Sequence, residues 1–253
     1  MVYRAVAVVV SSESLYVLGD KFNGEFSVIS ALKLANITSV AVALNSQYLR
    51  VHQASGGIVL LTRSQSSTQA IVSAIIPFIR GDAVLHHRAA TLATIDATLT
   101  AEQRTPPCML YALMLRGKPD GTLRTRELAA AEPVTLIVTH DALLLCTDAY
   151  NHYPLDPSYT GKIPQQFKVL ENRDLTDLAG VRFSSSHPST FTLVFDPVAN
   201  WQMTAVDSAT ERSILKQIAE LWKEQFFLSL RDSCVMDDNT AVPAERLWTE
   251  ESS

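Results

Sequence analysis

Residues 136–145 read LIVTHDALLL, and residues 5–18 read AVAVVVSSESLYVL. Each stretch consists of two β-rich apolar runs that are split by a short polar turn, His140-Asp141 in one and Ser11-Ser12-Glu13 in the other. Apolar runs of this length with turn residues between them predict a β-hairpin. The same hairpin pattern therefore occurs twice along the chain, which predicts an internal repeat.

The repeat continues after each hairpin. Leu34-Ala35-Asn36 matches Leu178-Ala179-Gly180, and Tyr48-Leu49-Arg50-Val51 matches Phe191-Thr192-Leu193-Val194. Alternating apolar residues predict further strands in both copies. The expected strands are 26–32, 37–44, 47–53 and 57–63 in the first copy, and 166–170, 180–184, 190–195 and 200–205 in the second. Gly56-Gly57 is expected to form a hairpin turn.

Each copy is expected to end in one amphipathic helix, over 66–79 and 208–227. Ser66-Ser67-Thr68-Gln69 and Ser208-Ala209-Thr210-Glu211 both fit a capping box, with a hydroxyl at the N-cap and Gln or Glu three residues later. Apolar residues at helical spacing predict a buried stripe on each helix. These residues are Ile71, Ile75 and Phe78 or Ile79 in the first, and Ile214, Leu215, Ile218, Leu221, Trp222 and Phe226 in the second.

Several short strands closed by one helix describe a mostly β (α+β) unit, a curled sheet plugged by a helix. Each copy resembles a pleckstrin-homology-like (PH-like) domain. The 136–145 stretch looks like the entry hairpin of divergent members, with Ser14-Leu15-Tyr16-Val17-Leu18 as its counterpart. Leu178-Ala179-Gly180-Val181 looks like the strand that follows, and the Trp222 helix lies where the family's closing helix lies. The resemblance covers 3–80 and 108–228 and implies two tandem PH-like curled β-sandwich units. A single larger sandwich is the alternative.

The expected organisation is a first domain over 1–80, a partly helical linker over 81–107, a second domain over 108–230 and a disordered tail over 231–253. The second copy has an additional strand, 108–115, followed by a hairpin at Lys118-Pro119-Asp120-Gly121 and a strand over 122–128. The first copy has no room for such a strand. Its sheet either lacks a first strand or takes one from the linker, the other copy or a partner chain.

Two further expectations follow from this organisation. An open sheet edge in the first domain is a route to homo-oligomers or to partner docking. The 150–165 segment is expected to be a surface loop of the second copy, because it is rich in Pro, Gly and Tyr. The sequence leaves open whether the chain is a fragment of a longer protein.

The composition argues against several classes of function. The net charge of −5 is not that of a non-specific DNA- or RNA-binding protein, which needs a basic field. Cys108, Cys146 and Cys234 are far apart, so free thiols in a reducing, cytoplasmic setting are expected. We find no phosphate-binding glycine motif, and His86-His87 has no ligand at metal-binding spacing. The sequence therefore predicts a non-catalytic protein without cofactor or metal, cytoplasmic and open to cytoskeletal association.

Basic residues near the second copy's first strand are the candidate ligand site. Lipid-binding PH-like domains often carry a Lys followed by a basic-x-basic pair, and Lys118 with Arg124 and Arg126 imitates that spacing, with Arg116 nearby. Alternate Arg residues on a strand point the same way, and guanidinium groups suit phosphate or an acidic partner. Six residues separate this pair from the hydrophobic hairpin, which is a departure from the family pattern. Trp248 in the tail is the candidate docking residue.

The preferred function from sequence is protein–protein interaction, as a scaffold module of a cytoskeletal, trafficking or signalling assembly. A phosphoinositide-binding module that recruits the protein to a membrane is the first alternative. The second is binding of a basic partner such as histones, which an acidic chain suits.

Overall fold

The structure is a computed structural model of the chain. It describes residues 6–20, 25–79, 84–87, 108–117, 131–150, 166–185, 189–195, 200–225, 234–237 and 240–243. The chain divides into two compact units. Unit 1 contains Met1–Thr91 and Ala149–Gln166, and unit 2 contains Leu92–Asp148 and Phe167–Ser253.

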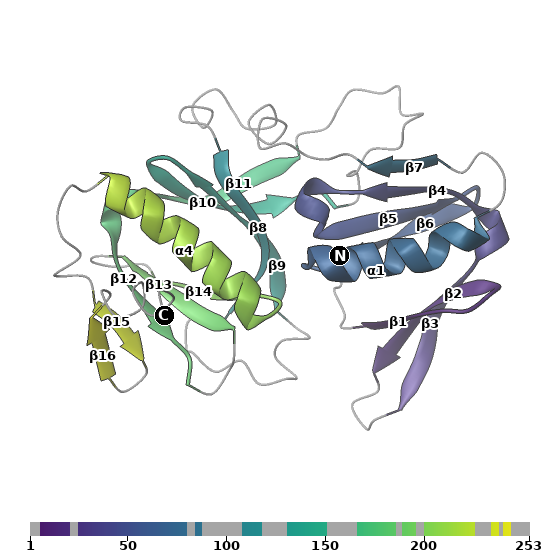
Figure 1. The fold of residues 1–253 in the computed structure, drawn as a ribbon, viewed down its shortest axis with the longest axis horizontal. Helices are drawn as coiled ribbons and strands as arrows, with labels where there is room; N and C mark the ends of the chain where they lie inside the picture. The colour runs from purple at the N-terminus through teal and green to yellow at the C-terminus, as the bar shows by residue number, and fades with distance from the viewer. Residues whose placement is uncertain are drawn as a thin grey trace, which may run out of the picture. The chain divides into compact units, whose positions relative to one another are not determined.

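Unit 1 has a three-stranded sheet in the order β1-β2-β3 and a four-stranded sheet in the order β6-β5-β4-β7 (Figure 1). One α-helix, α1, follows β6. The elements are β1 Val6–Val10, β2 Ser14–Asp20, β3 Phe26–Lys33, β4 Ile37–Val42, β5 Tyr48–Gln53, β6 Gly56–Leu61, α1 Gln65–Ile75 and β7 Val84–His87, with short 3₁₀ turns at Leu34–Asn36, Leu44–Ser46 and Ile76–Phe78. This is the predicted succession of alternating strands followed by a helix.

The core of unit 1 lies between its sheets and the helix. Leu15, Leu49 and Val51 are buried on the strands, and Val72 and Ile75 are buried on α1. Val72 and Ile75 are three residues apart, so they lie on one face of the helix. This buried face of α1 packs against the sheets of unit 1.

Unit 2 has one continuous nine-stranded sheet, in the order β11-β10-β9-β8-β14-β13-β12-β15-β16, which curls around the helix α4 (Figure 1). The elements are β8 Cys108–Arg116, β9 Glu132–Thr139, β10 Ala142–Asp148, β11 Phe167–Asp174, β12 Leu178–Phe183, β13 Thr190–Phe195, β14 Trp201–Thr204, α4 Ser208–Gln225, β15 Cys234–Asp237 and β16 Thr240–Pro243, with a 3₁₀ turn at Leu175–Asp177. The predicted strand over 122–128 lies outside the described residues. The partner of β8 is β9.

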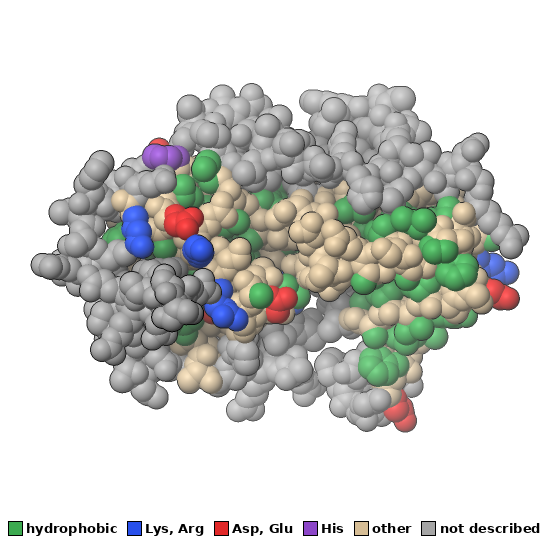
Figure 2. Space-filling view, viewed as in Figure 1, with side chains coloured by type: hydrophobic (Ala, Val, Ile, Leu, Met, Phe, Trp, Pro, Cys, Tyr) green, Lys and Arg blue, Asp and Glu red, His purple; other side chains and the backbone are tan. Residues whose placement is uncertain are grey.

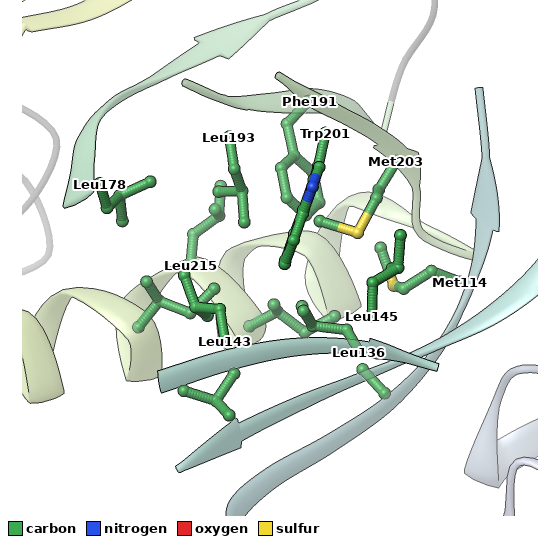
Figure 3. Close-up of a cluster of buried hydrophobic side chains, with 14 of the residues drawn as sticks. Met114, Leu136, Leu143, Leu145, Leu178, Phe191, Leu193, Trp201, Met203 and Leu215 are labelled. Atoms are coloured by element: carbon green, nitrogen blue, oxygen red, sulfur yellow. The ribbon is translucent and has the colours of Figure 1, made fainter. Parts of the chain in front are cut away.

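The core of unit 2 is a second, separate cluster of apolar side chains (Figure 3). Leu143 and Leu145 from the first half of the sheet face Phe191 and Trp201 from the second half, with Leu215 of α4 between them. The rings of Phe195 and Trp201 meet edge to face, with centroids 4.9 Å apart. Trp201 belongs to this core and is 2% exposed.

The hydrogen bonds of the two entry hairpins show that the hairpins have the same local structure. The Ser11 hydroxyl accepts from the Ser14 N–H at 3.0 Å, and the Thr139 hydroxyl accepts from the Ala142 N–H at 3.0 Å. Each hairpin also accepts a bond from the first residue of the later 3₁₀ turn. The Leu34 N–H donates to the Glu13 carbonyl at 2.9 Å, and the Leu175 N–H donates to the Asp141 carbonyl at 2.6 Å.

This correspondence corrects two matches that were made from sequence. Leu34-Ala35-Asn36 is equivalent to the 3₁₀ turn Leu175–Asp177, not to Leu178-Ala179-Gly180. Leu49 corresponds to Phe191, because each is paired with the last residue of the preceding strand. Alignment by residue type fails here, because equivalent positions share their burial but not their amino-acid identity.

The turn and capping assignments also shift by one or two residues. The helix α1 is capped by Ser64, whose hydroxyl accepts from the Ser67 N–H, so the expected cap at Ser66 is wrong. The cap of α4 is Asp207, whose Oδ1 accepts from the Thr210 N–H at 2.7 Å, rather than Ser208. Hydroxyl and carboxylate caps are interchangeable, so several neighbouring residues fitted the pattern.

The predicted hairpin turn at Gly56-Gly57 is wrong by two residues. Gln53 pairs with Gly56, which places Ala54 and Ser55 in the turn. Gly56 begins β6 with φ at +131°, a conformation that favours glycine. A Cβ at Gly57 would lie 2.5 Å from the Val51 carbonyl oxygen. Glycine is therefore favoured at both of the first two residues of β6.

Each unit has a strand after its helix, where a linker or a tail was expected. β7 pairs parallel with β4, with Ser39 opposite Val84, and β15 pairs parallel with β12, with Gly180 opposite Cys234. Residues 84–87 are therefore strand rather than helix. Residues 234–237 and 240–243 form a hairpin within the tail that was predicted to be disordered. The rest of 81–107 and of the tail lies outside the described residues.

The 150–165 segment also differs from its expectation at its ends. Tyr150 is buried in unit 1, where its ring meets that of Tyr48 edge to face at 5.4 Å and its carbonyl accepts from Arg50 Nη2 at 2.8 Å. Gln166 Nε2 donates to the Tyr48 hydroxyl at 3.3 Å. Tyr150, at the start of the expected surface loop, and Gln166, just after its end, are therefore buried contacts of unit 1, and residues 151–165 lie outside the described part.

Candidate binding surface

The two units differ at the strand that joins the halves of the sandwich. In unit 2, β8 pairs antiparallel with β9 on one side and with β14 on the other. The equivalents of β9 and β14 in unit 1 are β1 and β6, and both are edge strands in the described part of the chain. No described strand of unit 1 corresponds to β8. Among the described strands, unit 1 therefore has two sheet edges without a neighbour at the place where unit 2 has a shared strand.

Burial at equivalent positions shows what this strand would cover. The inward-facing residues of β9 are Val134, Leu136 and Val138, and all three are completely buried. Their equivalents on β1 are Val6, Val8 and Val10. Val6 is 40% exposed, and Val8 and Val10 are only partly buried against the core of unit 1. The apolar interior of unit 1 is thus open to solvent along β1.

The outer face of the β1–β3 sheet forms an exposed apolar patch, here called the outer patch. It contains Val9, which is 47% exposed, with Phe26 and Val28 of β3, which are 57% and 60% exposed. Tyr16 and Leu18 lie between them on β2, because Val9 pairs with Tyr16 and Leu18 pairs with Val28. Hydrophobic side chains lie over β1–β3 on the visible side of unit 1 (Figure 2).

The corresponding outer face of unit 2 is also apolar but is buried. Ile137, Leu144 and Cys146 occupy the positions of Val9, Tyr16 and Leu18, and each is at most 2% exposed. Both copies thus have two apolar faces on this sheet, whereas a sheet with one solvated face usually alternates apolar with polar residues. An exposed apolar face of this kind marks an interaction site.

Of the predicted basic site, only Arg116 lies in the described part of the chain. Its guanidinium forms an ion pair with Glu171 of β11, and Glu171 Oε2 also accepts from Trp201 Nε1 at 2.8 Å. Arg116 thus has an acidic partner within unit 2. Lys118, Arg124, Arg126 and Trp248 lie outside the described residues, so their roles remain predictions.

The remaining candidate residues of the sequence, in the turn at His140-Asp141 and at Cys146, have structural roles. His140 and Asp141 form the turn between β9 and β10, as predicted, and the Asp141 side chain accepts from the Thr139 hydroxyl at 3.3 Å. Cys146 is a buried free thiol. The described residues include no group of His, Cys, Asp and Glu that is suited to a metal ion. Within the same residues, no helix is both long and apolar enough to cross a membrane.

Asp207, Glu211 and Arg63 have shifted pKa values, and none of these residues belongs to the outer patch. Hydrogen bonds from the Thr210 backbone lower the pKa of Asp207, and burial raises the pKa of Glu211. Burial also lowers the pKa of Arg63, which follows β6 with a positive φ of 58°. These shifts are explained by helix capping and burial, so they give no evidence of catalysis.

Two family models match the chain, one for each unit. Residues 3–93 match the PLEKHM2 PH domain-like family, and residues 108–223 match the Nischarin C-terminal PH domain family. The chain is a tandem of two divergent PH-like domains. The predicted resemblance and fold class are confirmed. PH-like domains are generally non-catalytic and bind proteins or phosphoinositides.

The solved structures that match the chain include DH/PH proteins. An N-terminally truncated linker-DH/PH structure of p115-RhoGEF is 13% identical, with a TM-score of 0.34, over 49% of this chain and 32% of that one. A complex of human RhoA with the DH/PH fragment of PDZRHOGEF is 11% identical, with a TM-score of 0.35, over 65% and 46%. The chain thus spans about a third of the length of the p115-RhoGEF structure. A comparison with curated proteins gave no match. The assignment rests on the two family models.

Sequence reasoning missed the outer patch, although a signal for it was present. The sequence predicts a strand over 26–32 that contains Phe26 and Val28, but it does not fix which face of the sheet they occupy. Their pairing with β2 places them on the side opposite Leu15 and Val17, which are core residues. The register was needed to find the patch, because a bulge between Val17 and Leu18 changes the phase of the pairing.

Proposed function

We propose that the chain is a non-catalytic protein-binding module in a cytoplasmic cytoskeletal, trafficking or signalling assembly, and that the outer patch of the first PH-like domain contacts the partner. The single observation that supports this is the exposure of Val9, Phe26 and Val28 on one sheet face. The apolar chemistry of the patch suits a protein surface, because contact would remove three large hydrophobic side chains from water.

The test replaces the two most exposed side chains of the outer patch. Tagged wild-type chain and the Phe26→Ser/Val28→Ser variant are purified from cells, and the co-purified proteins are quantified by mass spectrometry. The expected result is at least one abundant partner that the variant loses. The matched control is Leu170→Ser, because Leu170 on β11 is an exposed apolar residue of the other domain, 39% exposed. Equal partner recovery with all three proteins would contradict the proposal.

Phosphoinositide binding is the competing function, and the basic sequence at Lys118, Arg124 and Arg126 is what favours it. The ion pair of Arg116 with Glu171 weighs against a free basic cluster at the end of β8. Co-sedimentation with phosphoinositide vesicles separates the two functions, with Arg124→Ala/Arg126→Ala as the variant. We expect no phosphoinositide-dependent sedimentation of the wild type. Sedimentation that the variant loses would establish the lipid function instead.

A basic protein partner, such as a histone, is a narrower form of the same protein-binding proposal. It is supported by the net charge of −5. In the purification above, this form requires that the recovered partners be basic and that their recovery fall with added salt.

A further inference from the structure

We propose that two copies of the chain associate through their outer patches, which pack face to face with corresponding strands antiparallel. The proposal rests on the proposed function, because it gives the same surface a second occupant, the chain itself. Each copy contributes the same residues, so the pair is closed by a two-fold axis. Another protein that binds the outer patch would do so by displacing the second copy.

The sheet face that carries the outer patch is apolar along all three strands. The pairing register places Ala7 and Val9 of β1, Tyr16 and Leu18 of β2, and Phe26, Val28 and Ala31 of β3 on this face. None of these side chains is charged at neutral pH. A charged surface repels its own copy, whereas this face can meet itself without bringing like charges together.

Charged residues lie at the two ends of this face and determine the direction of packing. Exposed Lys33 ends β3 on the outer face, and exposed Glu25 directly precedes β3 at the other end. Among the other described acidic residues, Asp20 ends β2 near the Glu25 end, and Glu13 lies in the turn at the Lys33 end. Antiparallel packing brings Lys33 of each copy toward Glu25 of the other. Parallel packing would instead gather the more acidic ends of both copies, so the charges favour the antiparallel arrangement.

The second domain shows that this sheet face accepts another layer. The equivalents of Val9, Tyr16 and Leu18 there are at most 2% exposed. In a pair of chains, each β1–β3 sheet would provide such a layer for the other, at the usual spacing of about 10 Å between stacked sheets. The contact would remove Phe26 and Val28, the most exposed apolar side chains of the patch, from water.

Packing by faces suits this sheet better than pairing through the edge of β3. The register shifts where Val17 pairs with Ser30 and Leu18 pairs with Val28, so Ile29 has no counterpart on β2. A bulge of this kind increases the local twist of an edge strand and hinders the addition of a further strand. The face is therefore the surface of β3 that a second copy can cover.

The size of the face predicts a reversible dimer. Three strands span two inter-strand spacings, about 10 Å, and the length of β3 corresponds to about 26 Å at the usual rise per residue. Two faces of this size lie at or below the lower limit for stable complexes, about 1,200 Å² of total buried surface. We therefore expect the pair to dissociate at micromolar concentrations, which would leave the patch accessible to a competing partner.

The experiment measures the mass of the purified full chain in solution. Sedimentation equilibrium is run from about 1 µM to about 200 µM, because a small interface dissociates in the micromolar range. We expect a monomer–dimer equilibrium for the wild type and association at least about tenfold weaker for Phe26→Ser/Val28→Ser. The matched control is Leu170→Ser, which removes an exposed apolar side chain from the second domain and should dimerise like the wild type. Circular dichroism verifies that each variant is folded.

Exchange of the end charges tests the antiparallel arrangement with substitutions of exposed residues only. Lys33→Glu and Glu25→Lys each place like charges together at both ends of the interface, so each should weaken dimerisation. The double variant Lys33→Glu/Glu25→Lys restores opposite charges and should dimerise more tightly than either single variant. Added salt should reduce the differences among these proteins, because it screens exposed charges.

Three results overturn the proposal. A wild-type chain that stays monomeric throughout the concentration range shows that the patches do not pair. Dimerisation that persists in Phe26→Ser/Val28→Ser shows that another surface, such as the edge of β1, joins the copies. A double charge variant that associates more weakly than both single variants excludes antiparallel packing.

These outcomes are distinct from a failure of the proposed function. The purification from cells can recover a different protein that Phe26→Ser/Val28→Ser loses even when the purified chain is monomeric, which would support the proposed function and overturn self-association. Dimerisation of the purified chain, with equal recovery of other proteins by the wild type and the variant, would support self-association and contradict the proposed contact with a different partner.

Discussion

Asp207 illustrates how a single carboxylate fixes the start of a helix. It is exposed, and its side chain accepts from the Thr210 N–H at the first turn of α4. We expect Asp207→Ala to lower the free energy of unfolding by about 1 kcal/mol, because a helix donor loses its partner. Asp207→Asn, which retains an N-cap acceptor, is the control and should lose less. Urea denaturation at neutral pH measures both.

The pKa shift of Asp207 adds a pH dependence. Its pKa is lowered by hydrogen bonds to the folded chain, so its carboxylate stabilises the fold above the ordinary pKa of aspartate. This contribution is lost as the pH falls through the lowered pKa. The difference between wild type and Asp207→Ala should therefore shrink in acid, and a constant difference across that range would contradict the assignment.

Glu211 has the opposite shift. It is a buried residue in the first turn of α4, and desolvation raises its pKa, while the neighbouring charge of Arg212 lowers it to a smaller extent. A raised pKa means that folding favours the protonated acid, so the carboxylate costs stability at neutral pH and the cost disappears as the pH falls. We expect Glu211→Gln to raise the unfolding free energy at pH 7 and to have no effect in acid. Glu220→Gln, at an exposed position on the same helix, is the control.

At the scale of elements, the β5–β6 hairpin depends on Gly57, which belongs to the strand β6 and not to the predicted turn. Because a Cβ at Gly57 would meet the backbone oxygen of Val51, Gly57→Ala should destabilise the first domain by about 1 to 3 kcal/mol. Gly19→Ala is the matched control: its nearest neighbour is the end of the flexible Ile29 side chain, which can move. Thermal unfolding should separate the two, and a larger loss for Gly19→Ala would contradict this account.

The elements themselves were largely predictable, and the reason is periodicity. Alternation along 47–53 and 190–195 and the helical stripe through Ile214 and Ile218 depend only on side-chain period, which sequence displays directly. Caps and turns shifted by one or two residues, because Ser64, Ser66 and Ser67 all satisfy the same chemical rule. The parallel strands β7 and β15 were not predictable, since their pairing with β4 and β12 depends on contacts distant in sequence.

At the scale of the whole molecule, the two hydrophobic clusters share no residue, which predicts two unfolding transitions. Leu49→Ala and Phe191→Ala truncate equivalent core positions, and each should cost about 2 to 5 kcal/mol in its own unit. We expect each substitution to lower only one calorimetric transition. A single transition that both substitutions lower equally would show that the units unfold together.

The candidate site shows where sequence reasoning reaches its limit. The hairpin that contains Ser14–Leu18 was predictable from its two apolar runs. Which residues are exposed was not visible, because exposure of Val6 or Phe26 depends on the register and on what covers each face. The basic residues Lys118, Arg124 and Arg126 are candidates through their spacing alone, and the structure adds only that neighbouring Arg116 pairs with Glu171.

The shared irregularities of the two units have a consequence for their ancestry. The pairing shifts between Val17 and Leu18 and between Leu145 and Cys146, and it shifts again between Ile37 and Ser39 and between Leu178 and Gly180, which are equivalent positions. Such defects have no reason to arise at matching places in unrelated genes. Equivalent bulges in both units are what descent from a common PH-like ancestor predicts, even though the two units match two different PH-like family models.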